Sequence, residues 1–157
     1  MLSIRGSYAG ALGVPQFMPS SYRNYAVDFN GDNTVDLLDQ TEDAIGSVAN
    51  YLKGYGWISG KDIVLETKIS GDQYLEAIGD SRTVAAWRTV GLQTSDRADK
   101  HDAARLVDYT IDDGKEFWLA LNNFEVITRY NNSDYYAMSV YQLAEAVKAA
   151  RKGSASK

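Results

Sequence analysis

The densest run of oxygen-bearing side chains lies in residues 28–39, which we call the acidic loop. Its sequence is DFNGDNTVDLLD, with oxygen side chains at loop positions one, three, five, nine and twelve. Position seven is Thr34, whose main-chain carbonyl can also bind a cation. Calcium prefers a cage of hard oxygen ligands at this spacing. The pattern therefore predicts a calcium site that includes Asp28, Asn30, Asp32 and Thr34.

Two positions of the acidic loop depart from the usual calcium-binding pattern. The sixth position is Asn33 instead of glycine, and asparagine also tolerates the left-handed conformation. The twelfth is Asp39, shorter than the glutamate that binds with both oxygens. Asp43, at the start of the following segment, is an alternative closing ligand to Asp39. The competing interpretation of the whole loop is a solvated acidic turn without a metal.

Other familiar catalytic patterns are missing from the sequence. The chain has one histidine, His101, in a polar stretch, and no cysteine, so thiolate zinc sites and cysteine nucleophiles are excluded. No phosphate-binding glycine loop is present. Glu125 comes closest to a carboxyl group in apolar surroundings, as a general acid requires, although a solvated position is the alternative.

A second candidate binding segment lies in residues 127–140. It combines tyrosines with an arginine and two adjacent amides just before an expected helix, a mixture suited to sugar hydroxyl and N-acetyl groups. Turn and capping chemistry explains residues 131–134 equally well.

Composition narrows the classes of partner. The net charge is −5, and no cluster of basic residues suits a phosphate backbone, so nucleic acid is not an expected partner. No apolar run approaches the roughly 20 residues that span a bilayer. The chain has 157 residues, 45% of them hydrophobic, enough for a compact core.

The hydrophobic pattern predicts an α+β chain. We expect a helix from Thr41 to about Gly54, with Thr41 as N-cap and residues 45, 48, 49 and 52 on its buried face. Residues 63–69 read as a strand, residues 74–78 and 83–90 as short helices, and residues 106–121 as a hairpin around an Asp-Gly turn. Residues 124–148 are rich in helix formers, and residues 151–157 read as a disordered tail.

Several segments together resemble the lytic murein transglycosylase B family. They are GSYAGALGVPQFMPSSYR at residues 6–23, the acidic loop, DAIGSVANY at residues 43–51, and RYN at residues 129–131. The resemblance implies a mainly helical, lysozyme-like core with an EF-hand-type calcium loop and a small strand-containing insert. Residues 1–57 and 123–150 would form the core, and residues 58–122 the insert.

The resemblance also implies an activity and a set of site residues. The family cleaves the β-1,4 bond between N-acetylmuramic acid and N-acetylglucosamine in peptidoglycan and leaves 1,6-anhydromuramoyl ends. Ser7 would support catalysis, and Gln16 would line the cleft beside it. Three further residues would contact the glycan: Tyr130, Asn131 and Tyr136. The structural calcium ion would be held by Asp28, Asn30, Asp32, the Thr34 carbonyl and Asp43.

The family's catalytic glutamate lies upstream of the segment that begins at Gly6, and no residue of this sequence matches it. We therefore expect an inactive fragment that lacks the general acid, with self-association through the apolar face left uncovered. The resemblance implies a location in the periplasm or cell envelope. The alternative function is a non-catalytic module that binds peptidoglycan or calcium. A calcium sensor is less favoured, because one loop lacks a paired partner and the chain has only three methionines.

Overall fold

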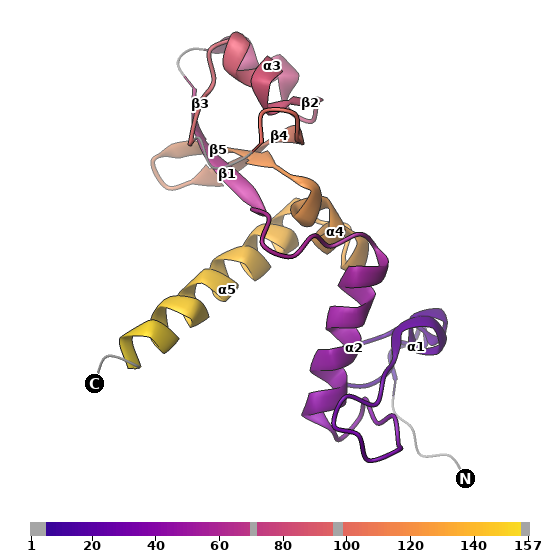
Figure 1. Ribbon diagram of the computed structural model, residues 1–157. Coiled ribbons are helices and arrows are strands. Elements are labelled where there is room, and N and C mark those ends of the chain that lie inside the picture. Colours follow the sequence, from indigo (N-terminus) through magenta and orange to yellow (C-terminus); the bar gives the residue numbers. More distant parts are fainter. Residues whose placement is uncertain (1–5, 70–71, 96–98, 155–157) are drawn as a thin grey trace. The chain divides into compact units, whose positions relative to one another are not determined.

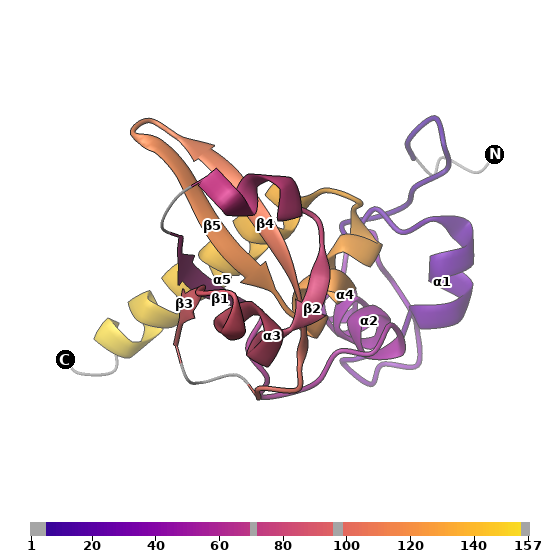
Figure 2. The same ribbon diagram turned by 90° about the horizontal axis from the view of Figure 1, so that it is seen from above.

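The computed structural model describes residues 6–69, 72–95 and 99–154. The chain divides into two compact units, residues 1–57 and residues 58–157. Figures 1 and 2 show the elements of each unit in two orthogonal views. The expected core of residues 1–57 with residues 123–150 stays a prediction. No helix within the described ranges is long and apolar enough to cross a membrane.

Unit 1 consists of two helices joined through the acidic loop. Helix α1 spans Pro19–Tyr25 and α2 spans Thr41–Gly54. Proline occupies the first turn of α1, where its missing N–H costs no hydrogen bond. Before α1, the backbone comes close to the acidic loop at Gly13, where a Cβ atom would lie 2.2 Å from the Leu37 carbonyl oxygen. Only glycine fits there, because its φ is also +69°.

The sequence prediction for α2 was right about the helix and wrong about its buried face. Ile45, expected inside, is 62% exposed. Thr41 is the first helical residue, and the N-cap is Gln40, which makes no side-chain capping bond. The buried face instead holds Asp43, Ala44, Gly46, Ser47 and Tyr51. Polar contacts decide this orientation, since the Ser47 hydroxyl accepts the Val27 N–H at 2.9 Å.

Unit 2 contains a five-stranded sheet with strand order β2-β4-β5-β1-β3. Its strands pair antiparallel throughout. Their bounds are β1 Val64–Lys68, β2 Ser81–Thr83, β3 Gln93–Thr94, β4 Ala103–Ile111 and β5 Gly114–Ala120. The predicted hairpin is β4 and β5. Its turn is followed by Gly114 at φ +134°.

One face of the sheet is covered by the short helices η1 (Asp72–Ala77) and α3 (Val84–Thr89). Trp87 of α3 is fully buried, and its indole N–H donates to the Ala104 carbonyl at 2.8 Å. It packs in a cluster with apolar residues of several elements: Leu65, Tyr74, Val84, Leu92, Ala104, Leu106, Leu119 and Leu121. The cluster forms the core of unit 2 and keeps the strands in register.

The segment of residues 124–148, which is rich in helix formers, forms two helices. Helix α4 spans Asn122–Tyr130 and α5 spans Asp134–Ser154, with a break at residues 131–133. The break fits the Asn-Asn-Ser sequence, because these side chains bond to nearby backbone and favour turns. Residues 151–154, expected in a disordered tail, continue α5. Residues 155–157 lie outside the described residues.

Candidate functional site

The junction between α4 and α5 brings the predicted glycan-contacting residues together. We call residues 130–136 the α4–α5 turn. The rings of Tyr130 and Tyr136 lie parallel, with centroids 6.4 Å apart and 3° between their planes. Asn131 lies between them in sequence as an exposed C-cap of α4. Burial, followed by the nearby Tyr136 phenol, raises the pKa of Tyr130 to about 12.

The turn is held by bonds within its own backbone. The Ser133 N–H donates to the Asn131 carbonyl at 2.7 Å, and the Ser133 hydroxyl accepts the Tyr136 N–H at 3.2 Å. Serine therefore caps the start of α5, as its residue type favours. The turn presents three phenols and two exposed amides, those of Asn131 and Asn132. Such groups can stack on sugar rings and hydrogen-bond to their substituents.

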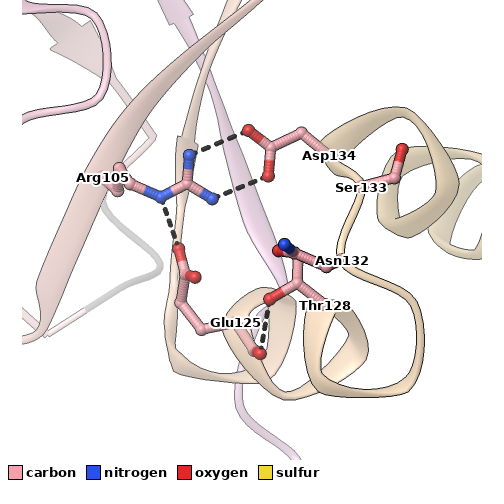
Figure 3. Close-up of a pocket in the computed structure, with 6 residues that line it drawn as sticks. All are labelled: Arg105, Glu125, Thr128, Asn132, Ser133 and Asp134. Carbon is pink, nitrogen blue, oxygen red and sulfur yellow. Dashed lines mark hydrogen bonds and ion pairs between the residues drawn. The ribbon is translucent and has the colours of Figure 1, made fainter.

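An arginine of the sheet meets both helices beside this turn (Figure 3). Arg105 on β4 donates through Nε to Glu125 Oε1 at 2.8 Å. Its two terminal nitrogens donate to the two carboxylate oxygens of Asp134, at 2.9 and 2.8 Å. The ion pairs raise the pKa of the Arg105 guanidinium, with Asp134 as the main cause. Glu125 is therefore an ion-pair acceptor in this structure, and its Oε1 atom is occupied.

A polar cavity of about 370 Å³ opens at this cluster. It is lined by Arg105, Glu125, Thr128, Asn132, Ser133 and Asp134 (Figure 3). Thr128 uses its hydroxyl to donate to the Glu125 main-chain carbonyl at 2.8 Å. The walls therefore come from β4, α4, the α4–α5 turn and the start of α5.

Ser7 and Gln16 lie in the tight segment that precedes α1. The Ser7 hydroxyl accepts the Ala11 N–H at 3.0 Å, and the Ser7 N–H donates to the Ala11 carbonyl at 3.0 Å. Gln16 is exposed, has φ +51°, and donates from its side-chain amide to the Gly13 carbonyl at 2.8 Å. Both predicted residues belong to unit 1, and each is tied to the local backbone by its side chain.

The acidic loop folds around the carboxylate of Asp28. Asp28 Oδ1 accepts the N–H groups of Gly31 at 2.6 Å and Asp32 at 3.2 Å. Asp28 Oδ2 accepts the Asn33 N–H at 2.7 Å. Asn33 adopts the predicted left-handed conformation, with φ +68°. The loop therefore turns tightly around its first residue and bends at its sixth. Calcium-binding loops have a ligand and a sharp turn at these two positions.

Asp43 reaches back from α2 into the same loop. Its side chain is fully buried, with Oδ1 accepting the Phe29 N–H at 2.8 Å and Oδ2 accepting the Asp36 N–H at 2.9 Å. These bonds, that from Asp36 above all, hold the pKa of Asp43 below its usual value. Burial without these partners would act in the opposite direction. Of the two alternative closing residues, Asp43 is the one whose carboxylate lies against both ends of the loop, whereas Asp39 is exposed.

Asp32 and Asn30 of the acidic loop are also engaged in hydrogen bonds. Asp32 Oδ1 accepts the Thr34 N–H at 2.8 Å, and Asp32 Oδ2 accepts the Gln40 side-chain amide at 2.7 Å. The Gln40 bond is the main reason that the pKa of Asp32 is lowered. Gln40 also accepts the amide of Asn30. In the part of the chain that is described, no three His, Cys, Asp or Glu side chains converge as a metal site, so any cation must also use amide and carbonyl oxygens.

Sequence reasoning missed the role of Arg105. It recognised Glu125 and the α4–α5 turn, but Arg105 lies 20 residues before Glu125 and 29 before Asp134. Only the pairing of β4 in the sheet brings these residues together. The alternation of the β4 sequence predicts a strand and carries no signal for an ion pair with distant helices. His101, which lies in a polar stretch of the sequence, is exposed.

Comparison with known proteins adds the identity of the family. The model of the transglycosylase SLT domain matches residues 1–145. Membrane-bound lytic murein transglycosylase B of Escherichia coli (strain K12) is 41% identical over 150 residues, which are 96% of this chain and 41% of that protein. The chain thus spans less than half the length of this curated relative.

Two solved structures show the same fold. Soluble lytic transglycosylase SltB1 from Pseudomonas aeruginosa superposes with a TM-score of 0.89 at 42% identity, over 96% of this chain and 51% of that one. The Escherichia coli lytic transglycosylase Slt35, in complex with calcium, gives a TM-score of 0.82 at 40% identity, over 96% and 48% of the two chains. The expected lysozyme-like transglycosylase fold with an antiparallel sheet is thereby confirmed. From the extent of the family match and these identities, the chain belongs to the lytic murein transglycosylases of the B type.

Proposed function

We propose that this chain binds peptidoglycan glycan strands through the α4–α5 turn. The observation that carries the proposal is the parallel pair of Tyr130 and Tyr136, with exposed Asn131 between them in sequence. Aromatic rings stack on the apolar faces of sugars, and amides bond to hydroxyl and N-acetyl groups. Membership of a murein-cleaving family supports glycan as the ligand.

The reaction that we propose is cleavage of the bond between N-acetylmuramic acid and N-acetylglucosamine with formation of a 1,6-anhydromuramoyl end. It needs one carboxyl group, which first protonates the leaving oxygen and then accepts the proton of the muramoyl 6-hydroxyl group. The attacking hydroxyl belongs to the substrate, so no protein nucleophile is required. In this proposal the glutamate that the family places before Gly6 performs the proton transfers, and the residues of this chain orient the glycan.

Ser7 and Gln16 are the residues of unit 1 for which we propose a role in glycan binding or cleavage. Their segment is held rigidly by main-chain bonds between Ser7 and Ala11 and between Leu12 and Phe17. A rigid backbone orients polar groups without a large entropy cost on binding. We propose that Ser7 supports the reacting carboxyl group and that Gln16 bonds to the glycan. The proposed compartment is the periplasm or cell envelope, where peptidoglycan lies.

We also propose that the acidic loop binds a structural calcium ion. The donors would be Asp28, Asn30, Asp32, the Thr34 carbonyl and Asp43, with Asp39 as the alternative to the last. The hard oxygen chemistry of this set fits calcium, and the loop already bends at Asn33 as such loops require. Bound calcium would supply positive charge that holds the loop against α2, because Asp43 belongs to α2. The calcium complex of Slt35 supports the proposal.

Digestion of purified sacculi tests the proposed reaction. The chain, and the same chain extended upstream, would be incubated with sacculi, and the products analysed by mass spectrometry for 1,6-anhydromuropeptides. We expect such products from the extended protein and few from residues 1–157 alone. 1,6-Anhydromuropeptides produced by residues 1–157 alone would contradict the assignment of the general acid to an upstream glutamate.

A binding assay tests the glycan site separately. The Kd of a soluble muropeptide would be measured by NMR titration for the wild type and for Asn131→Ala. Gln142→Ala provides the matched amide control, since Gln142 is exposed on α5. We expect weaker binding for Asn131→Ala alone. An unchanged Kd for Asn131→Ala would remove this residue from the site.

A further inference from the structure

Arg105 lies on β4, yet its guanidinium group bonds to both helices that enter the α4–α5 turn (Figure 3). Three of its N–H groups are used, one on Glu125 at 2.8 Å and two on Asp134 at 2.8 and 2.9 Å. Because guanidinium is planar, bonds in two directions fix the angle between its partners as well as their distance.

The two partners belong to the two different helices that the turn joins. Glu125 belongs to α4, five residues before Tyr130, and Asp134 begins α5, two residues before Tyr136. Each carboxylate therefore lies close in sequence to one of the two stacked tyrosines. A group that fixes both carboxylates fixes the two helix ends from which the rings project.

The same strand holds the start of α5 by two further contacts. The Tyr109 hydroxyl on β4 donates to the Asp134 main-chain carbonyl at 3.1 Å. The Tyr109 ring meets the Tyr135 ring edge-on, with centroids 5.3 Å apart and 85° between the planes. The start of α5 thus contacts β4 through the Asp134 side chain, the Asp134 main-chain carbonyl and the Tyr135 ring.

We propose that Arg105 is a positioning residue for glycan binding, which sets the geometry of Tyr130, Asn131 and Tyr136 from the sheet. The inference rests on the proposed function of the α4–α5 turn. Through Arg105, the sheet determines the shape of a binding surface built by helices.

The test compares Arg105→Met and Arg105→Lys with the wild type. Methionine keeps much of the side-chain bulk and removes the charge, and lysine keeps the charge and loses the planar fork. The readouts are the Kd for a soluble muropeptide, the nuclear Overhauser contacts between the Tyr130 and Tyr136 rings, and the melting temperature. Arg82→Met is the matched control, because Arg82 also forms an ion pair, at 3.0 Å with Asp80, away from the turn.

We expect Arg105→Met to weaken muropeptide binding by about tenfold or more, since small misplacements of positioning groups have effects of this order. The ring-to-ring contacts should weaken in parallel. Compared with Arg105→Met, Arg105→Lys should bring the melting temperature closer to the wild-type value than it brings the affinity for muropeptide. A purely structural role would make the two recover together, and that result would overturn the inference.

Two further outcomes are decisive. If the wild type does not bind muropeptide, the proposed function fails and the inference fails with it. If the wild type binds and folded Arg105→Met binds equally well, only the inference is overturned. Should Arg105→Met fail to fold, Asp134→Asn takes its place, because it removes the charged partner with little change of shape. Weaker binding by Asp134→Asn supports the inference, and unchanged binding overturns it.

Discussion

At the scale of single residues, Tyr130 differs from a solvent-exposed phenol. Burial raises its pKa to about 12, so the folded state keeps the proton at a pH where unfolded tyrosine, with a pKa of about 10, has begun to lose it. Because its pKa is about 12, the phenol keeps its proton and remains able to donate a hydrogen bond at a pH where an exposed tyrosine is partly ionised. This property suits a group that is proposed to bond to sugar oxygens.

The shifted pKa predicts a pH dependence of stability. A raised folded-state pKa contributes stability that is complete below pH 10 and is lost as the pH rises through about 12. We expect the wild type to lose free energy of unfolding over this interval and Tyr130→Phe to lose less. Denaturant unfolding at several alkaline pH values measures the difference. Tyrosinate absorbance would give independent evidence, and a titration unchanged by Tyr130→Phe would contradict the prediction.

At the scale of elements, Asn123 attaches α4 to the segment that leads into β1. Its buried side-chain oxygen accepts the Ile58 N–H at 2.9 Å, and its nitrogen donates to the carbonyls of Ile58 at 2.9 Å and Lys61 at 3.1 Å. One side chain therefore satisfies three main-chain groups of a segment without regular structure. Sequence reasoning gave this residue no special role.

Replacement of Asn123 by alanine should leave these main-chain groups without their partner. Loss of a buried partner costs about 1–3 kcal/mol. We expect a decrease in the free energy of unfolding of this order, measured by urea denaturation. Asn132→Ala is the control, since Asn132 is exposed. Equal stability of the two variants would show that water replaces the Asn123 side chain.

The elements also show where sequence reasoning succeeds. Local rules predicted the bend at Asn33, the hairpin whose turn precedes Gly114, and the helix from Thr41. At residues 131–133 the sequence offered turn chemistry as one of two explanations, and local polar bonds do separate the two helices there. Of the candidate site, the α4–α5 turn and the acidic loop were predicted. Arg105 was not, because strand order decides which distant residues meet.

The buried face of α2 illustrates the same limit. Periodicity placed Ile45 inside, yet Asp43 and Ser47 occupy the fully buried positions. The bond of Ser47 to Val27 and the bonds of Asp43 to the acidic loop compensate for the burial of polar atoms. A hydrophobic pattern cannot anticipate this arrangement, because the partners are main-chain groups in another segment.

At the scale of the whole molecule, calcium should increase thermal stability. A ligand that binds only the folded state at 100 times its Kd stabilises by about 2.7 kcal/mol. We expect calcium to raise, and a chelator to lower, the melting temperature of the wild type in calorimetry. The double variant Asp28→Asn with Asp32→Asn should lose this response, and Asp80→Asn, which alters an exposed ion pair, should keep it. An equal response in the double variant would place the cation elsewhere.

Gly46 connects the stability of a helix with the position of a loop. It lies inside α2, where alanine would favour the helix by roughly 1 kcal/mol. A Cβ atom there, however, would lie 2.5 Å from two carbon atoms of the Phe29 side chain, in the acidic loop. The change that strengthens the helix in isolation thus displaces the residue next to Asp28. Directed evolution for heat resistance in the presence of calcium should therefore keep glycine at position 46, although alanine is the better helix former. Selection without calcium should allow its replacement by alanine.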